Sequence, residues 1–192
     1  MKSTGIILAG GASSRMGEEK GLVEYDGKSM IEHILVALQG AVDHILIVAS
    51  DERYGQFGYP VYSDLIPQKG PVGGIYTGLH YSSTELNICL SCDVPLVTTE
   101  FIEWIMQVSS NGVTLPRCNG KTHQLMGVYR KSALSIFREA IDSDELKLSL
   151  VNEKAGCTII DVEESSVDFD VRIFSNLNTK ADINKGYNET GG

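Results

Sequence analysis

The sequence has little that would suit a membrane or a nucleic acid. No apolar run approaches the length of a bilayer span, and no charged and then apolar leader precedes the first predicted strand. Basic side chains number 16 against 25 acidic ones, so the formal net charge is −9. Nucleic acids and anionic membranes both favour partners with dense lysine and arginine. We therefore expect a cytoplasmic protein with neither a nucleic acid nor a membrane among its partners.

Cysteine is also scarce, with four residues in 192. Cys89 and Cys92 have C-x-x-C spacing, but no second C-x-x-C completes a zinc site. The pair lies inside an apolar run rather than at a helix start, where a redox thiolate would be stabilised. Ordinary buried thiols are the favoured interpretation. Internal repeats and linkers are absent, which predicts one domain over residues 1–187 with a frayed tail at 188–192.

Short apolar runs alternate with amphipathic stretches along the chain. Strands are predicted at 6–9, 44–49, 61–62, 86–91, 113–117, 125–129 and 158–162. Helices are predicted at 30–39, 99–109, 133–141 and 147–154, with another that follows a glycine-rich loop at 70–74 and ends at 81. This alternation predicts an α/β fold, a three-layer, doubly wound and mainly parallel sheet covered on both faces. Ligands of such sheets bind beyond the carboxyl ends of the strands.

The first predicted strand ends at a glycine turn that is followed by cations. Gly10 and Gly11 permit backbone conformations that a Cβ forbids, and they expose N–H groups. Arg15 and Lys20 add positive charge, which a turn that only connects a strand to a helix would not need. Backbone donors followed by cations suit a polyphosphate, so the stretch predicts a nucleoside triphosphate site. The G-x-G-x-x-G and G-K-[ST] spacings are both missing, which disfavours a dinucleotide-dependent oxidoreductase.

Two carboxylates also follow predicted strands. Asp64 comes after the strand at 61–62, and Asp93 after the strand at 86–91. One crevice at the carboxyl edge of the sheet could gather both with the glycine turn. Each has a plainer interpretation, since Asp93 before Val94-Pro95 could cap a turn and Asp64 is one acid in an acidic chain.

The glycine turn carries a longer pattern, Leu8-Ala9-Gly10-Gly11-x-Ser13-x-Arg15-Met16-Gly17-x-x-Lys20-Gly21. It resembles the signature of nucleotidyltransferases that activate small metabolites as nucleoside diphosphates. Three further stretches, 64–74, 92–95 and 176–179, make the chain most similar to the molybdenum cofactor guanylyltransferases. The resemblance implies a Rossmann-like nucleotidyltransferase fold. It also implies Mg²⁺-dependent transfer of GMP from GTP to the phosphate of molybdopterin, with release of pyrophosphate.

The resemblance also implies roles for single residues. Arg15 and Lys20 would hold the phosphates, Asp93 would bind Mg²⁺, and these three would form the catalytic set. The nucleotide-binding set would add Asp64 at the nucleoside and the backbone of Leu8, Ala9, Gly10 and Gly11. Asn176 and Asn178 would face the pterin, although turn and helix-cap roles are the alternative for both. Partners implied are GTP, molybdopterin, and proteins that deliver the cofactor or collect the product.

The sequence departs from the family pattern at two places. One concerns recognition of the nucleotide base, and the other concerns His123. Ser50-Asp51 stands where the family often has an asparagine, and His123 is present without the proline that usually accompanies it. Nothing in the mechanism needs an imidazole, so a polar loop role is favoured for His123. Cytidylyl transfer to molybdopterin and sugar-phosphate nucleotidyl transfer remain alternatives. A further alternative is a non-catalytic regulator that binds nucleotides. Such a protein would not need to keep both phosphate-binding cations, Arg15 and Lys20, and the metal-binding carboxylate of Asp93.

Overall fold

The computed structural model describes residues 1–10, 19–110, 112–165 and 167–177. Three residues of the predicted site, Gly11, Arg15 and Asn178, lie outside these ranges, as does the predicted tail at 188–192. Within the described ranges, no helix is both long and apolar enough to cross a bilayer.

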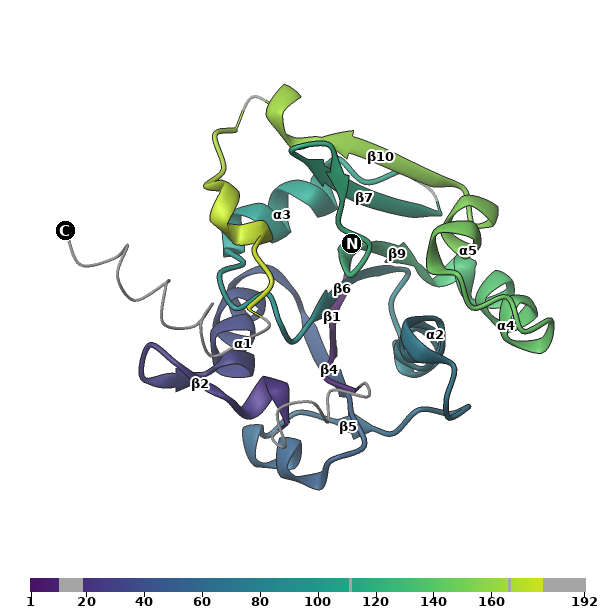
Figure 1. Cartoon of the computed structure of the whole chain (residues 1–192), viewed down its shortest axis with the longest axis horizontal. Helices are drawn as coiled ribbons and strands as arrows, with labels where there is room; N and C mark the ends of the chain where they lie inside the picture. The colour runs from purple at the N-terminus through teal and green to yellow at the C-terminus, as the bar shows by residue number, and fades with distance from the viewer. Residues whose placement is uncertain (11–18, 111, 166, 178–192) are drawn as a thin grey trace.

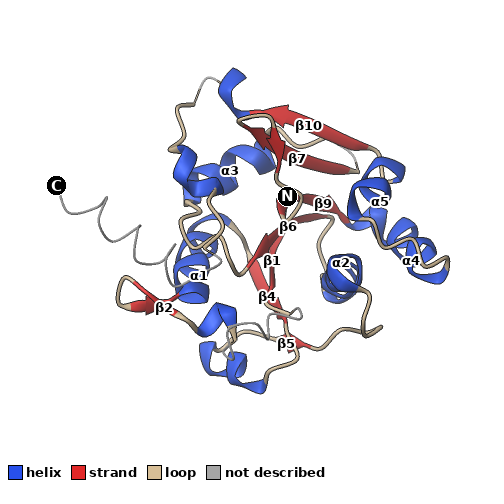
Figure 2. Ribbon diagram, viewed as in Figure 1, coloured by secondary structure: helices blue, strands red, loops and turns tan. Residues whose placement is uncertain are grey.

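A central sheet separates two layers of helices (Figures 1 and 2). Its strand order is β10-β7-β9-β6-β1-β4-β5, and the short β8 pairs with β7 beside this path. The strands are β1 (Ser3–Leu8), β4 (His44–Val48), β5 (Val61–Tyr62), β6 (Leu86–Ser91), β7 (Val113–Cys118), β8 (Lys121–Thr122), β9 (Met126–Arg130) and β10 (Cys157–Asp161). The predicted mainly parallel sheet is confirmed.

The reversal of β9 is the feature that the periodicity did not predict. β9 runs antiparallel to both β6 and β7, whereas the other neighbours on the path are parallel. The chain turns back at Asn119-Gly120, both with positive φ, and β8 and β9 both pair antiparallel with β7. So short a connection cannot make the crossover that a parallel neighbour requires. A tight turn therefore places the segment 121–125 at the same edge as the ends of the parallel strands.

Helices cover both faces of the sheet (Figure 1). On one face lie α1 (Met30–Ala41) and α3 (Thr99–Gln107), and on the other α2 (Gly70–Tyr81), α4 (Leu134–Asp142) and α5 (Leu148–Lys154). Successive β1 residues alternate between these cores, because Ile7 packs with α1 and α3 while Ile6 and Leu8 pack with α2, α4 and α5. The two-sided burial expected for this strand is confirmed.

The predicted loop at 70–74 is wrong, because these residues form the first turns of α2. Pro71 suits this place, since the first amide groups of a helix have no intrahelical acceptor. The glycines serve close packing. A Cβ on Gly73 would come within 2.8 Å of the Lys69 Cβ, and one on Gly78 would overlap the Ile6 side chain of β1. At Gly78, α2 therefore lies directly against β1.

Two small segments complete the edge of the sheet that carries the site. A hairpin of β2 (Glu24–Tyr25) and β3 (Lys28–Ser29) leads into α1. The segment 169–177, here called the C-terminal strap, lies beside α3 (Figure 1). Its Phe174 ring lies 5.3 Å from that of Phe101 in this helix. Leu177 is buried with Tyr25 and Met30. The strap thus returns the chain to the end of β6.

Candidate functional site

Two adjoining cavities lie at the carboxyl ends of the parallel strands. The larger has a volume of about 610 Å³ and the smaller about 170 Å³. Ser91 at the end of β6 and Leu125 before β9 line both, so the cavities meet there. The predicted crevice at this edge is present, and it has two compartments.

The larger cavity is built mainly by the ends of β1, β4 and β5 and by the start of α2. Leu8, Gly10 and Asp64, three of the residues expected to bind the nucleotide, line it. The Ala9 side chain instead packs in the core under α1 and α3, and its N–H donates to the Val48 carbonyl at 2.9 Å. Pockets for small ligands usually enclose about 300–1,000 Å³, so this cavity has room for a nucleoside.

Asp64 lines this cavity and has one buried carboxylate oxygen. Within the described chain, its Oδ1 atom has no hydrogen-bond partner. Burial raises the pKa of this carboxyl. A Cβ on Gly74 would lie 3.9 Å from that oxygen, so the glycine leaves the approach open. Among the described residues Asp64 Oδ1 is therefore an acceptor without a donor, and a ligand hydroxyl or N–H group could supply one.

Asp93 gathers two distant side chains around it. The Lys20 ammonium donates to Asp93 Oδ2 at 3.0 Å, and the Asn176 amide donates to the same oxygen at 3.2 Å. The Leu177 N–H donates to the Asp93 carbonyl at 3.0 Å, which holds the strap in place. The side chains of Lys20 and Asp93 are only 16% and 14% exposed. Three predicted site residues are thus brought together from three separate segments.

The second oxygen of Asp93 is suited to a cation. Asp93 Oδ1 is buried and has no hydrogen-bond partner in the described part of the chain. The described ranges contain no group of three or more His, Cys, Asp or Glu side chains that could hold a metal. Mg²⁺ needs no such group, because it commonly uses one or two carboxylates with water and phosphate oxygens. The residues present therefore fit a Mg²⁺ ion held jointly with a phosphorylated ligand.

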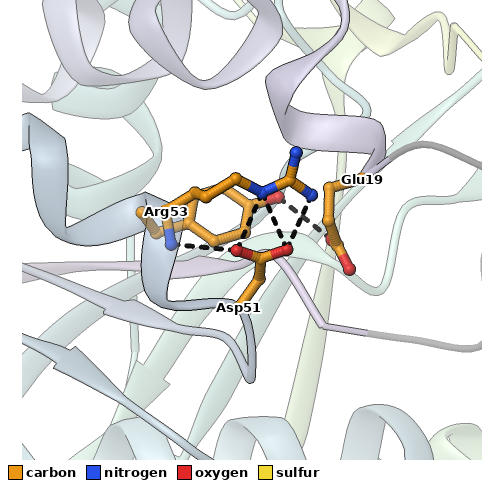
Figure 3. Close-up of polar contacts among 4 residues, drawn as sticks. Glu19, Asp51 and Arg53 are labelled. Carbon is orange, nitrogen blue, oxygen red and sulfur yellow. Dashed lines mark hydrogen bonds and ion pairs between the residues drawn. The ribbon is translucent and has the colours of Figure 1, made fainter.

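Ser50 and Asp51 have different roles, one at the cavity and the other in a local turn. Ser50 lines the larger cavity. Asp51 caps the 3₁₀ helix Glu52–Phe57, where its carboxylate accepts from the Arg53 N–H at 2.9 Å and from the Arg53 guanidinium at 2.7 Å (Figure 3). These bonds hold the pKa of Asp51 below its usual value. The hydroxyl of Tyr54, the residue that follows Arg53, donates to Glu19 at 3.4 Å. Asp51 is thus engaged in its own turn.

Several lining residues were not predicted as site residues. Gln68 joins the larger cavity, and Lys121 and Thr122 join the smaller one. The positive φ of Gln68 is invisible in the sequence. His123 also lines the smaller cavity, with its ring 4.9 Å from Phe174, and burial lowers its pKa. A polar loop role for His123 stays a prediction.

The C-x-x-C cysteines take no part in the site. Cys89 and Cys92 are both buried and form no disulfide. They belong to different cores, Cys89 under α2 and Cys92 under α1 and α3. Burial raises the pKa of both thiols, that of Cys92 to about 12. The interpretation as ordinary buried thiols is confirmed.

A mainly parallel sheet with helices on both faces and a cavity beyond the strand ends is a doubly wound α/β fold with a ligand site in its usual place. The structure resembles that of "Molybdopterin-guanine dinucleotide biosynthesis protein A" from Archaeoglobus fulgidus with a TM-score of 0.81 at 23% identity, covering 97% of this chain and 98% of that one. It also resembles CMP:2-keto-3-deoxy-manno-octonic acid synthetase complexed with CTP, with a TM-score of 0.77 at 16% identity over 99% and 98% of the two chains. At these identities the likeness concerns the fold.

The chain belongs to the family of the MobA-like NTP transferase domain, whose model matches residues 5–155. It is 39% identical to a "Probable molybdenum cofactor guanylyltransferase" of Flavobacterium johnsoniae over 94% of each chain. It is 32% identical to a "Molybdenum cofactor guanylyltransferase" of Serratia proteamaculans, over 98% of this chain and 95% of that one. The family expected from the sequence is confirmed, and the chain is a nucleotidyltransferase.

Proposed function

We propose that this protein transfers GMP from GTP to the phosphate of molybdopterin and releases pyrophosphate, with Mg²⁺ as its cation. The names of its relatives support these substrates. The observation that carries the proposal is the position of Asp93, which lines the smaller cavity beside Ser91, where the two cavities meet. With one oxygen bonded to Lys20 and the other unpartnered among the described residues, Asp93 stands where two phosphorylated substrates would meet.

The chemistry needs no covalent enzyme intermediate. An oxygen of the acceptor phosphate forms a bond to the α-phosphorus of GTP, while the bond from that phosphorus to the bridging oxygen of the β-phosphate breaks. Pyrophosphate leaves with the electron pair. A phosphate monoester is already ionised and nucleophilic near neutral pH, so no Ser-His-Asp arrangement is required. The protein supplies alignment of the reacting groups and neutralisation of the developing charge.

Each half of the site has a defined task in this reaction. The end of β1 at Leu8 and Gly10 would hold the nucleotide, and Asp64 would accept a hydrogen bond from the nucleoside. Lys20 would neutralise charge on the phosphates. Asp93 would hold Mg²⁺, which when bound supplies Lewis acidity toward phosphate oxygens. By resemblance, Arg15 and Gly11 would bind the phosphates and nucleotide, and Asn178 would join Asn176 at the pterin.

Pyrophosphate release measured across four nucleotides tests the proposal. The purified protein, Mg²⁺ and molybdopterin are incubated with GTP, CTP, ATP or UTP in parallel. We expect release with GTP, and none when EDTA replaces Mg²⁺. A preference for CTP would indicate cytidylyl transfer to molybdopterin instead. Pyrophosphate release with a sugar phosphate as the acceptor would indicate a sugar-phosphate nucleotidyltransferase. A folded preparation that binds GTP but releases no pyrophosphate with any pairing would be a regulator.

A further inference from the structure

The smaller cavity has the size of a chemical group rather than of a whole ligand. Its volume of about 170 Å³ falls below the range of about 300–1,000 Å³ that is usual for small-molecule pockets. Asp93 lies in its wall, and the wall shared at Ser91 and Leu125 joins it to the larger cavity. A group held here would lie beside the nucleotide phosphates that Asp93 and Lys20 are proposed to hold.

Lys121 supplies positive charge to this cavity. It is the only lysine or arginine among the described residues that line it, and its side chain is exposed. In the described ranges Lys121 forms no ion pair with an acidic side chain. His123 is a weaker candidate for a cation, because burial and the nearby Lys121 charge lower its pKa. Lys121 is therefore the group in this wall suited to an anion.

The backbone that carries Lys121 is held firmly. Lys121 pairs with Cys118 across the turn, and the His123 N–H donates to the Pro116 carbonyl at 3.0 Å. The next residue, Gln124, accepts at its side chain from the Asn152 amide at 3.3 Å. The backbone of Lys121 is thus anchored at the edge of the cavity.

We propose that Lys121 binds the phosphate of the acceptor in the smaller cavity and orients it toward the α-phosphorus of the nucleotide. The inference rests on the proposed function. The acceptor phosphate is dianionic, and it approaches a chain of net charge −9, a triphosphate and the Asp93 carboxylate. Like charges of this kind repel unless a local cation offsets them. Lys20 is already bonded to the Asp93 carboxylate, and Lys121 would meet this need in the wall of the smaller cavity.

Steady-state kinetics of Lys121→Ala with both substrates varied tests this assignment. A charge-assisted hydrogen bond at an exposed site predicts an increase of about tenfold in KM for molybdopterin. The KM for GTP should stay at the wild-type value. Lys121→Arg should restore most of the affinity, and Lys121→Glu should weaken it further. Lys154→Ala removes the same charge from an exposed residue that lines neither cavity, and it should leave both constants unchanged.

Ionic strength gives a second measure of the same contact. In the wild type, KM for molybdopterin should rise with added KCl, and the rise should be shallower in Lys121→Ala. An unchanged KM for molybdopterin in Lys121→Ala, with an active wild type, would overturn the inference and leave the proposed function standing. A wild type that releases no pyrophosphate with any nucleotide would overturn the proposed function itself. Circular dichroism of each variant identifies any loss of fold.

Discussion

The two cavities differ in how the chain builds them. The larger one draws mainly on the ends of three parallel strands and on the first turns of α2, which all lie between residues 8 and 74 apart from Ser91 and Leu125. The smaller one draws on the β8 turn, on the residues after β6 and on the strap, which are spread from residue 91 to residue 176. One is a product of local strand and helix geometry, and the other of contacts between distant segments.

This difference predicts how the cavities respond to substitution. Changes in the larger cavity should alter the use of the nucleotide alone, because its wall is part of the rigid sheet and helix layers. Changes in the smaller cavity should alter the use of the acceptor alone. Two pairs of residues should alter both: Ser91 and Leu125, which line both cavities, and Asp93 and Lys20, which are proposed to act on the phosphates of both substrates. Three experiments can break or sharpen this division, and a fourth tests the burial of Asp64 in the wall of the larger cavity.

The largest effect is expected for Asp93→Ala. Loss of the carboxylate that contacts Lys20 and Asn176 should lower pyrophosphate release by about 10²–10³-fold, by analogy with the removal of one transition-state donor. Lys20→Ala should act in the same direction. Asp142→Ala, an exposed acid paired with Arg138, is the matched control. Initial rates at saturating substrates measure the effect, and wild-type rates in both site variants would refute the division.

A smaller effect, confined to the acceptor, is expected for Asn176→Ala. The amide donates to Asp93 Oδ2 at 3.2 Å and lines the smaller cavity. Loss of one exposed hydrogen bond predicts an increase of about two- to tenfold in KM for molybdopterin. The control is Ser175→Ala, an exposed neighbour in the strap that lines neither cavity. If the KM for GTP rises as much as that for molybdopterin, Asn176 contributes to the use of both substrates and the division between the cavities fails.

Substitutions at two glycines of α2 should affect different properties, GTP binding at Gly74 and the stability of the fold at Gly78. A Cβ at Gly74 meets Leu8 at an ordinary 3.4 Å and faces the larger cavity, whereas one at Gly78 overlaps Ile6. Gly74→Ala should raise KM for GTP and leave the protein as stable or more so, by about 0.5–1 kcal/mol. Gly78→Ala should instead cost about 1–3 kcal/mol through overpacking. Urea unfolding and GTP kinetics on both variants measure this, and equal losses of stability would contradict it.

The smallest effect concerns the pH dependence of stability at Asp64. Burial raises the pKa of this carboxyl in the folded state above its unfolded value of about 3.9. The stabilisation linked to the protonated form is complete below the unfolded pKa, and it is lost as pH rises through the folded one. Asp64→Asn cannot ionise, so its stability relative to the wild type should increase as pH rises through this window. Urea unfolding at a series of pH values measures the difference.

Asp51 provides the matched control with the opposite sign. Its hydrogen bonds to Arg53 lower its pKa in the folded state. That stabilisation is present above the unfolded pKa and is lost as pH falls through the folded one. The stability lost in Asp51→Asn should therefore shrink toward acid pH. If both variants gave the same pH profile, burial and hydrogen bonding would not be the causes assigned here.

The positions that directly follow parallel strands could be predicted. Gly10, Asp64 and Asp93 each come after a short apolar run, and parallel strands end at a common edge. The helix at 70–74 was predicted wrongly as a loop, because glycine is typical of loops. Here the glycines let α2 approach β1. Lys121 could not be recognised, since a lysine in a polar turn has no distinguishing neighbours.

By itself, the sequence determined the alternation of strands and helices, the burial of β1 on both faces and the glycine turn at its end. These follow from the period of the apolar residues and from the freedom of glycine, which are properties of short segments. Only the tertiary structure decided the rest. The pairing of β8 and β9 with β7 brings Lys121 to the smaller cavity, and the packing of the strap sets Asn176 against Asp93, 83 positions away. Contacts between distant side chains depend on the whole packed core, and no local pattern encodes them.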